Sequence, residues 1–218
     1  MKEISKDLYI YQKKYGANRF SNFIYIRIKK KGYLFGVFKN SVQLPKKELN
    51  EINELGGVDA ILITHRDELR SGNEALLKAF NCDIYISELD YKEIQSSFGK
   101  YPKIKYITGK KIGPFQPVYT PGHSKGFYSF VVKHHDENIW FSGDMPYIKG
   151  DHLMLSGAKH TDYFKYSIEG YKKIIRSKVN KVFSCKMEGT KIPYINKGNK
   201  LEDGLKNLII NLEKDLEK

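Results

Sequence analysis

A short apolar run that ends in a polar cluster constrains this chain more than any other feature. Residues 60–63 (Ala-Ile-Leu-Ile) are followed at once by Thr64, His65 and Asp67. An apolar run of this length bounded by polar groups is typical of a buried strand. A strand that ends in a histidine and a carboxylate predicts the rim of a functional site, because a rigid element holds such side chains in place.

Three later stretches place a candidate ligand directly after an apolar run in the same way. They are residues 120–123 (Thr-Pro-Gly-His), 142–144 (Ser-Gly-Asp) and 182–185 (Val-Phe-Ser-Cys). We expect these stretches and the first one to meet at the same rim of the folded chain.

Length and composition predict a single domain that spans residues 1–218 and contains a hydrophobic core. Of the 218 residues, 40% are hydrophobic and 13% aromatic, which is enough to fill the interior of a single domain. No stretch approaches the roughly 18 apolar residues that a membrane span needs, and the first residues lack the apolar region of a signal peptide. Two cysteines, Cys82 and Cys185, are too few for a secreted disulfide framework. We therefore expect a cytoplasmic protein that contacts no membrane.

The chain is strongly basic, and most of its basic residues are lysines rather than arginines. The net charge is +13, and the 38 basic residues include only five arginines. Nucleic-acid recognition relies on arginine for bidentate and stacked contacts. Residues 98–111, basic with interleaved aromatics, fit either a nucleic-acid strip or an exposed loop and strand. We favour the second interpretation, so the expected partner is a small-molecule substrate of unknown identity, with nucleic acid as the less favoured alternative.

Apolar periodicity and turn signals predict two β-rich halves, each with helices. Expected strands cover residues 8–12, 22–28, 33–38, 60–63, 82–87, 117–120, 126–132, 138–144 and 181–185. Expected helices cover residues 45–55, a segment capped by Ser71 or Asn73, residues 88–97, a segment capped by Thr161 or Asp162 and ending near 178, and residues 201–216. Residues 145–160 are expected to form a loop near the rim. This order suits an α/β fold in which two mixed sheets pack together with helices outside, a four-layer αββα sandwich.

The motifs, in this order, resemble the metallo-β-lactamase superfamily over about residues 20–190. The core motifs of that family are T-H-x-H-x-D-H after a strand, then T-P-G-H, G-D and a late histidine. Here the matching stretches read T-H-R-D-E-L-R at 64–70, T-P-G-H at 120–123, S-G-D at 142–144 and S-C-K at 184–186. The first motif also resembles a divergent subgroup that reads about T-H-R-D-D-V-A-D-H. The resemblance implies the αββα sandwich, with the site at one edge of the paired sheets.

The resemblance also implies a metal site made of His65, Asp67, His123 and Asp144. His65, His123 and Asp144 match family ligands, and Asp67 stands where the second histidine belongs. Two histidines with one or two carboxylates are chemically adequate for one Zn, Fe or Mn ion.

The residues that depart from the family motif stand at positions that bind the second metal of a binuclear centre in the family. Leu69 replaces an aspartate, Arg70 replaces a ligand and cannot bind a metal, and Cys185 occupies the late histidine position. The resemblance therefore implies a degenerate site with one metal. In the alternative, Arg70 or Lys186 forms ion pairs with the carboxylates and no metal binds.

Two functions follow from this pattern. In the first, the chain is a metal-dependent hydrolase in which Asp67, Glu68 and Asp144 are catalytic, and Glu68 or Asp144 assists the attacking water. In the second, it is a pseudoenzyme or binding module on the same scaffold, with nucleic acid among its candidate partners. Cys185 could act as a nucleophile activated by His123, but a free cysteine is more often a small buried residue.

Overall fold

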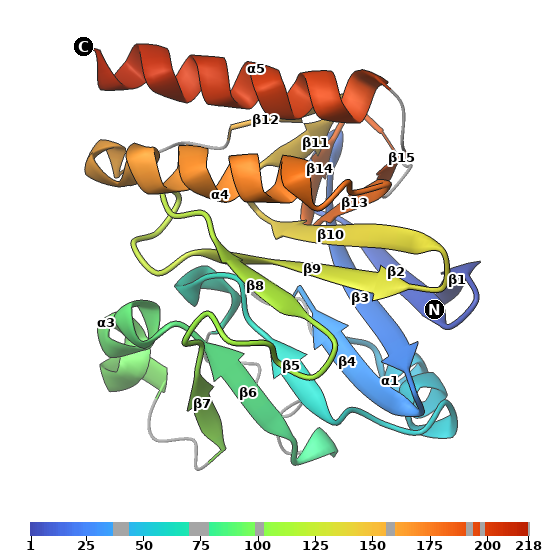
Figure 1. Cartoon of the computed structure of the whole chain (residues 1–218). Coiled ribbons are helices and arrows are strands. Elements are labelled where there is room, and N and C mark those ends of the chain that lie inside the picture. Colours follow the sequence, from blue (N-terminus) through green and yellow to red (C-terminus); the bar gives the residue numbers. More distant parts are fainter. Residues whose placement is uncertain are drawn as a thin grey trace.

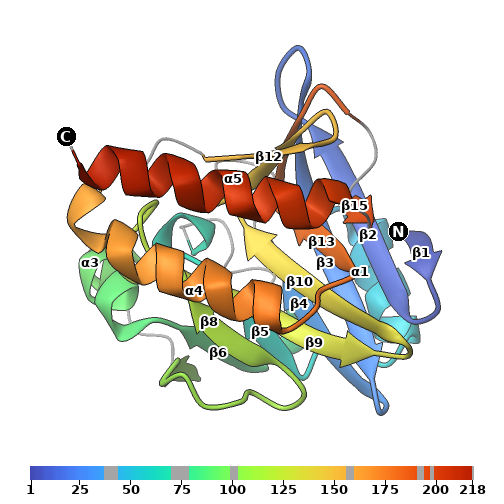
Figure 2. The same ribbon diagram turned by 45° about the horizontal axis from the view of Figure 1, so that its top comes forward.

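Two β-sheets lie face to face in the computed structural model, and helices cover the outer face of each (Figure 1). The structure describes residues 1–36, 44–69, 79–98, 103–155, 160–190, 194–196 and 199–217. Helices α1 (Lys46–Glu54) and α3 (Glu88–Phe98) lie against the larger sheet. Helices α4 (Phe164–Arg176) and α5 (Asn199–Leu216) lie side by side against the smaller one (Figure 2). The predicted αββα sandwich is confirmed.

The larger sheet mixes antiparallel and parallel strands, in the order β12-β11-β14-β3-β4-β5-β6-β7, with β2 joining β3 to β1. Its strands are β1 (Lys2–Ser5), β2 (Leu8–Lys14), β3 (Arg19–Ile28), β4 (Lys31–Phe35), β5 (Ala60–Leu62), β6 (Asp83–Ile86), β7 (Ile104–Tyr106), β11 (Tyr147–Lys149), β12 (His152–Met154) and β14 (Lys186–Glu188). From β4 to β7 all pairings are parallel. The carboxyl ends of these strands therefore meet at one edge of the sheet.

The smaller sheet has the order β15-β13-β10-β9-β8. Its strands are β8 (Gln116–Tyr119), β9 (Tyr128–His134), β10 (Glu137–Gly143), β13 (Lys181–Ser184) and β15 (Tyr194–Asn196). β9 and β10 form the predicted hairpin, in which Glu137 pairs with His134. β10 and β13 are parallel, so their carboxyl ends also share an edge.

Alternation along the strands divides the apolar side chains among three cores. In β3, Phe23 and Tyr25 pack toward α1 and α3, whereas Ile24 and Ile26 pack between the sheets. In β10, Trp140 packs toward α4 and α5. Successive side chains of a strand point to opposite faces, so a strand covered on both sides is apolar throughout. Burying each such side chain contributes roughly 1.5–3 kcal/mol.

The predicted loop over residues 145–160 is wrong for the part that the structure describes. Residues 147–149 and 152–154 form the β11–β12 hairpin, and β11 pairs in parallel with β14. Strands of three residues are too short to show an alternating pattern, and the partner strand lies about 40 residues away in the sequence. Strands β14 and β15 have three residues each and were not predicted either; β1, a four-residue strand paired with β2, was also not predicted.

The predicted cap of the helix that follows is also wrong. Thr161 and Asp162 lie in a 3-10 turn (Thr161–Tyr163), and α4 begins at Phe164 after Tyr163, without a side-chain cap. The helix predicted from Ser71 or Asn73 lies outside the described residues except for positions 79 and 80, which are helical, and Arg70 lies outside them too. Of residues 98–111, the described part from 103 onward is loop and strand, as favoured from the sequence. Among the described residues, no helix is long and apolar enough to cross a bilayer.

Candidate metal centre

Four of the predicted site residues come together where strand ends of the two sheets meet. His65 follows β5, Asp67 lies in the 3-10 turn after it (Arg66–Glu68), and His123 lies between β8 and β9. One ligand atom from each of these three residues lies within 4.8 Å of the other two. Asp144 directly follows β10, and its Oδ2 lies 3.7 Å from His65 Nε2. The structure thus places all four predicted metal ligands at one edge of the sandwich.

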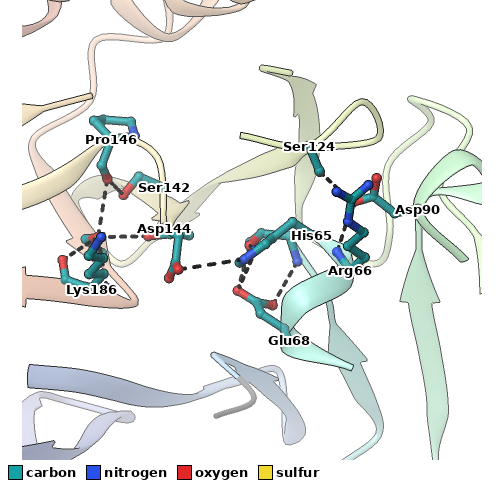
Figure 3. A network of polar contacts seen from close by, with 12 residues as sticks. His65, Arg66, Glu68, Asp90, Ser124, Ser142, Asp144, Pro146 and Lys186 are labelled. Carbon is teal, nitrogen blue, oxygen red and sulfur yellow. Dashed lines mark hydrogen bonds and ion pairs between the residues drawn. The ribbon is translucent and has the colours of Figure 1, made fainter. Parts of the chain in front are cut away.

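The imidazole of His65 is oriented by hydrogen bonds on its Nδ1 side (Figure 3). The Thr64 hydroxyl donates to Glu68 Oε1 at 2.6 Å, and Thr64 Oγ1 lies 3.1 Å from His65 Nδ1. Because the hydroxyl proton goes to Glu68, the oxygen can accept a proton from Nδ1; in the neutral ring this leaves a lone pair on Nε2. An outer hydrogen bond of this kind fixes the tautomer and ring orientation of a metal-binding histidine.

The donor set and its spacing fit one divalent ion. Ligand atoms of a tetrahedral zinc ion lie about 3.4 Å apart when each bond is roughly 2.1 Å long. The 3.7 Å between His65 Nε2 and Asp144 Oδ2 is close to that value, whereas the 4.8 Å limit of the other set is longer, so those side chains have to move closer together to hold one ion. Moreover, Nε2 and Oδ2 are both acceptors in this tautomer, so a cation between them would stabilise their approach.

Gly143 brings the end of β10 against the end of β5. Its φ of +66° is in the left-handed region, and a Cβ at this position would lie 2.3 Å from Thr64 Oγ1. Only glycine satisfies both the backbone conformation and this approach. The glycine of the Ser-Gly-Asp motif therefore allows Asp144 to reach His65.

Glu68 lies behind His65 rather than beside its Nε2. Its carboxylate accepts hydrogen bonds from the Thr64 backbone N–H at 3.0 Å and from the Thr64 hydroxyl, and its side chain is 3% exposed. These contacts suit a residue that holds His65 in place. They do not bear on the predicted catalytic role of Asp67 or Asp144.

Two positions where the family places ligands are occupied differently here. Leu69 is 1% exposed and packs in the core between the larger sheet and helices α1 and α3. Cys185 follows β13 and is buried, and burial together with the nearby Glu68 and Asp144 carboxylates raises the pKa of its thiol well above 9.0. A neutral thiol is a poor nucleophile and a poor metal ligand. Nearby, Lys186 Nζ lies 4.9 Å from the centroid of the Tyr147 ring.

Other residues near the site were not predicted from the sequence as site residues. The backbone N–H of His160 donates to the Gly122 carbonyl at 3.2 Å, which places His160 beside the turn that carries His123. Asp90, in the first turn of α3, is fully buried and contacts the segments that follow both histidines. Its partners are 24 to 36 positions away in the sequence, so no local pattern indicates the contact. In contrast, His152 is 78% exposed and pairs with Asp151, outside the site.

No protein-family model and no curated protein sequence matches this chain. Solved structures do match its fold. DIM-1 metallo-β-lactamase is 13% identical with a TM-score of 0.71, over 97% of this chain and 95% of that one. VMB-1 is 18% identical with a TM-score of 0.69, over 98% and 95%. AidC, a dizinc quorum-quenching lactonase, is 12% identical with a TM-score of 0.52, over 82% and 79%.

These likenesses establish the class of fold. The chain has the metallo-β-lactamase fold, as the order of its motifs implied, and it is a divergent example at 12 to 18% identity to these structures. Its His-Asp-His cluster could hold a metal ion.

Proposed function

We propose that this protein is a metal-dependent hydrolase that binds one divalent ion through His65, Asp67, His123 and Asp144. The observation that carries the proposal is the convergence of three ligand atoms within 4.8 Å. The hydrogen bonds that orient His65 Nε2 toward Asp144 support it further. The fold is shared with a metallo-β-lactamase and with a lactonase described as a dizinc enzyme, which agrees with hydrolysis at a metal.

Each protein group has a distinct role in this proposal. When bound, the ion supplies Lewis acidity, which activates a water and polarises a substrate carbonyl or phosphoryl oxygen. His65, Asp67 and His123 hold the ion, and Glu68 keeps His65 oriented through Thr64. Asp144 lies on the Nε2 side of His65, where its carboxylate can both bind the ion and accept the proton of the attacking water. We assign the catalytic role to Asp144 and a positioning role to Glu68.

The substrate in this proposal is a small molecule with a hydrolysable carbonyl or phosphoryl group. Cys82 and Cys185 are both free and buried, which agrees with a cytoplasmic location.

A second candidate, a non-catalytic binding module, is favoured by the two altered positions. Leu69 lies in the core, so it supplies no donor for a second ion, and burial with nearby carboxylates disfavours the thiolate form of Cys185. A fold that has lost half of a binuclear centre can persist as a scaffold for partners.

Metal analysis separates the two candidates. Untagged protein purified without chelator is expected to contain about one Zn, Fe or Mn ion per chain, by analogy with three-ligand sites. His123→Ala should lose this ion, whereas His152→Ala, a matched change at an exposed histidine outside the site, should retain it.

Activity is then assayed with the loaded protein on a β-lactam, a lactone, a carboxylic ester and a phosphodiester. Hydrolysis that is lost in Asp144→Ala supports the hydrolase. Metal without any hydrolysis across the panel overturns the catalytic part of the proposal. If the wild-type protein binds no metal even after reloading with each ion, the binding module is the better account.

A further inference from the structure

Asp90 connects two backbone segments that are far apart in the sequence (Figure 3). Its Oδ2 accepts a hydrogen bond from the Arg66 backbone N–H at 2.9 Å and another from the Ser124 hydroxyl at 2.6 Å. Its Oδ1 accepts a third from the Gly126 backbone N–H at 2.8 Å. The side chain is 0% exposed. All three donors are therefore held by one carboxylate inside the protein, where hydrogen bonds to a charged group are strong.

The chain is built to approach this carboxylate closely. A Cβ on Gly126 would lie 2.7 Å from Asp90 Oδ1 and 2.4 Å from Ser87 Oγ, so only glycine fits at this position. Asp90 itself lies in the first turn of α3, where a helix favours a negative charge.

The two segments are those that carry the candidate histidine ligands. Arg66 directly follows His65, which extends from the larger sheet, and Ser124 directly follows His123, which extends from the smaller sheet. The two imidazole rings are 4.9 Å apart between centroids and nearly perpendicular. We propose that Asp90 is the positioning residue that sets the spacing of His65 and His123. This inference rests on the proposed metal site, because that spacing matters for function only if both histidines bind one ion.

The two bonds to Ser124 and Gly126 link segments that extend from different sheets. They act beside one backbone bond between the same segments, from the Tyr128 N–H to the Thr64 carbonyl at 2.9 Å. A metal site tolerates only small changes in ligand distance, and loss of an outer partner typically weakens metal affinity 10- to 100-fold. Asp90 does not touch the ion in this proposal; it acts through the backbone beside each ligand.

The test compares Asp90→Asn with Glu93→Gln in the full chain. Glu93 is the matched control because it lies one turn further along α3 and also contacts Arg66, but through the guanidinium Nη1 and at the surface. Asn keeps the size of Asp90 but turns one acceptor into a donor that faces an N–H or O–H group. Ser124→Ala removes only one of the three bonds and serves as a milder variant if Asp90→Asn fails to fold.

Two readouts are made on each variant. The first, on metal-free protein, is hydrogen exchange of the Arg66 and Gly126 amides, which should speed up at least 10-fold in Asp90→Asn and stay unchanged in Glu93→Gln. The second is the affinity for Co²⁺ and the d–d spectrum of the bound ion. Asp90→Asn should bind about 10- to 100-fold more weakly with an altered spectrum, Ser124→Ala should be intermediate, and Glu93→Gln should match the wild type.

The outcomes separate this inference from the proposed function. If the wild type binds Co²⁺ and Asp90→Asn, or Ser124→Ala in its place, binds equally well with the same spectrum, the inference is overturned and the metal site stands. If the wild type binds no metal, the metal site and the functional meaning of the spacing are both overturned, and amide exchange shows only whether Asp90 holds the two segments together.

Discussion

The two halves of the candidate centre are built differently. The retained half (His65, Asp67 and His123) brings its donors within 4.8 Å and is supported by hydrogen bonds behind it. The lost half (positions 69 and 185) offers a leucine packed into the core and a thiol whose pKa is raised by burial and neighbouring carboxylates. Asp144 lies between the halves, 3.7 Å from His65.

The difference shows that the two positions of the lost half relate differently to the contacts that support the retained half. His65 is oriented by Thr64 and Glu68, and the backbone after His65 and His123 is held by Asp90. The side chain of Leu69 takes no part in these contacts. The thiol of Cys185, in contrast, hydrogen-bonds Glu68, so this position of the lost half touches the support of His65.

The largest expected effect comes from restoring a carboxylate to the lost half. Leu69→Asp should lower the free energy of unfolding by about 3–5 kcal/mol, because it buries an unpaired charge in the core. It should not raise the metal content above that of the wild type, since the side chain at this position packs against the core rather than the site. Urea denaturation and metal analysis of the same samples measure both quantities.

Leu69→Met is the control for this change, and it should cost less than about 1.5 kcal/mol because the volume of the side chain is nearly kept. A stable Leu69→Asp protein that binds a second ion would show instead that position 69 faces the centre, and the contrast between the halves would disappear.

A smaller effect is expected when a residue that orients a ligand of the retained half is changed. Thr64→Val keeps the shape of the side chain but removes the hydroxyl between Glu68 and His65 Nδ1. Metal affinity should fall about 10- to 100-fold, as for other losses of an outer partner, measured by competition with a chromophoric chelator. Ser129→Ala is the control, because it removes another buried hydroxyl that bonds Thr120 and contacts no candidate ligand. Equal affinities in all three proteins would mean that His65 needs no such orientation.

Much of the fold, and the placement of the candidate ligands, could be predicted from the sequence. The apolar runs before His65 and Asp144 are buried strands in the structure, and the stretches at strand ends meet at one edge because parallel strands share their direction. The hairpin of β3 and β4 turns at Lys29 and Lys30, whose φ values of 52° and 67° match a two-residue turn.

What the sequence could not predict depends on partners that are distant along the chain. β11 exists because β14 lies beside it, and Asp90 has its role because two other segments approach it. Leu69 was interpreted only as a lost ligand, whereas in the structure it is a core residue, because a motif gives the order of side chains but not the face to which each one points. Glu68 or Asp144 was expected to assist the water, which stays a prediction; the position of Glu68 on the Nδ1 side of His65, set by its bonds to Thr64, was not expected.

The smallest expected effect comes from a change at a histidine that is remote from both halves. Its contribution to the pH dependence of stability has to be known before any contribution from the centre can be measured. His134 ends β9, is 6% exposed, and donates from Nε2 to the Lys6 carbonyl at 2.8 Å. Burial lowers the pKa of His134 below 6.5. The unfolded chain therefore binds this proton more readily, so stability falls as the pH drops from about 6.5 toward the folded-state pKa, with no further loss below it.

His134→Gln keeps an N–H donor for Lys6 but cannot be protonated, so unfolding free energies measured between pH 5 and pH 8 should lose this part of their slope. His135→Asn is the control, because the neighbouring histidine is exposed in a turn with a φ of 50°. The slope that remains in His134→Gln can then be tested for a contribution from the retained half by adding metal. The slope should become steeper if His65 and His123 bind the ion as neutral imidazoles, because the bound ion keeps protons off the folded state but not off the unfolded chain. A slope that is unchanged by His134→Gln would mean that other groups control the acid sensitivity of the fold.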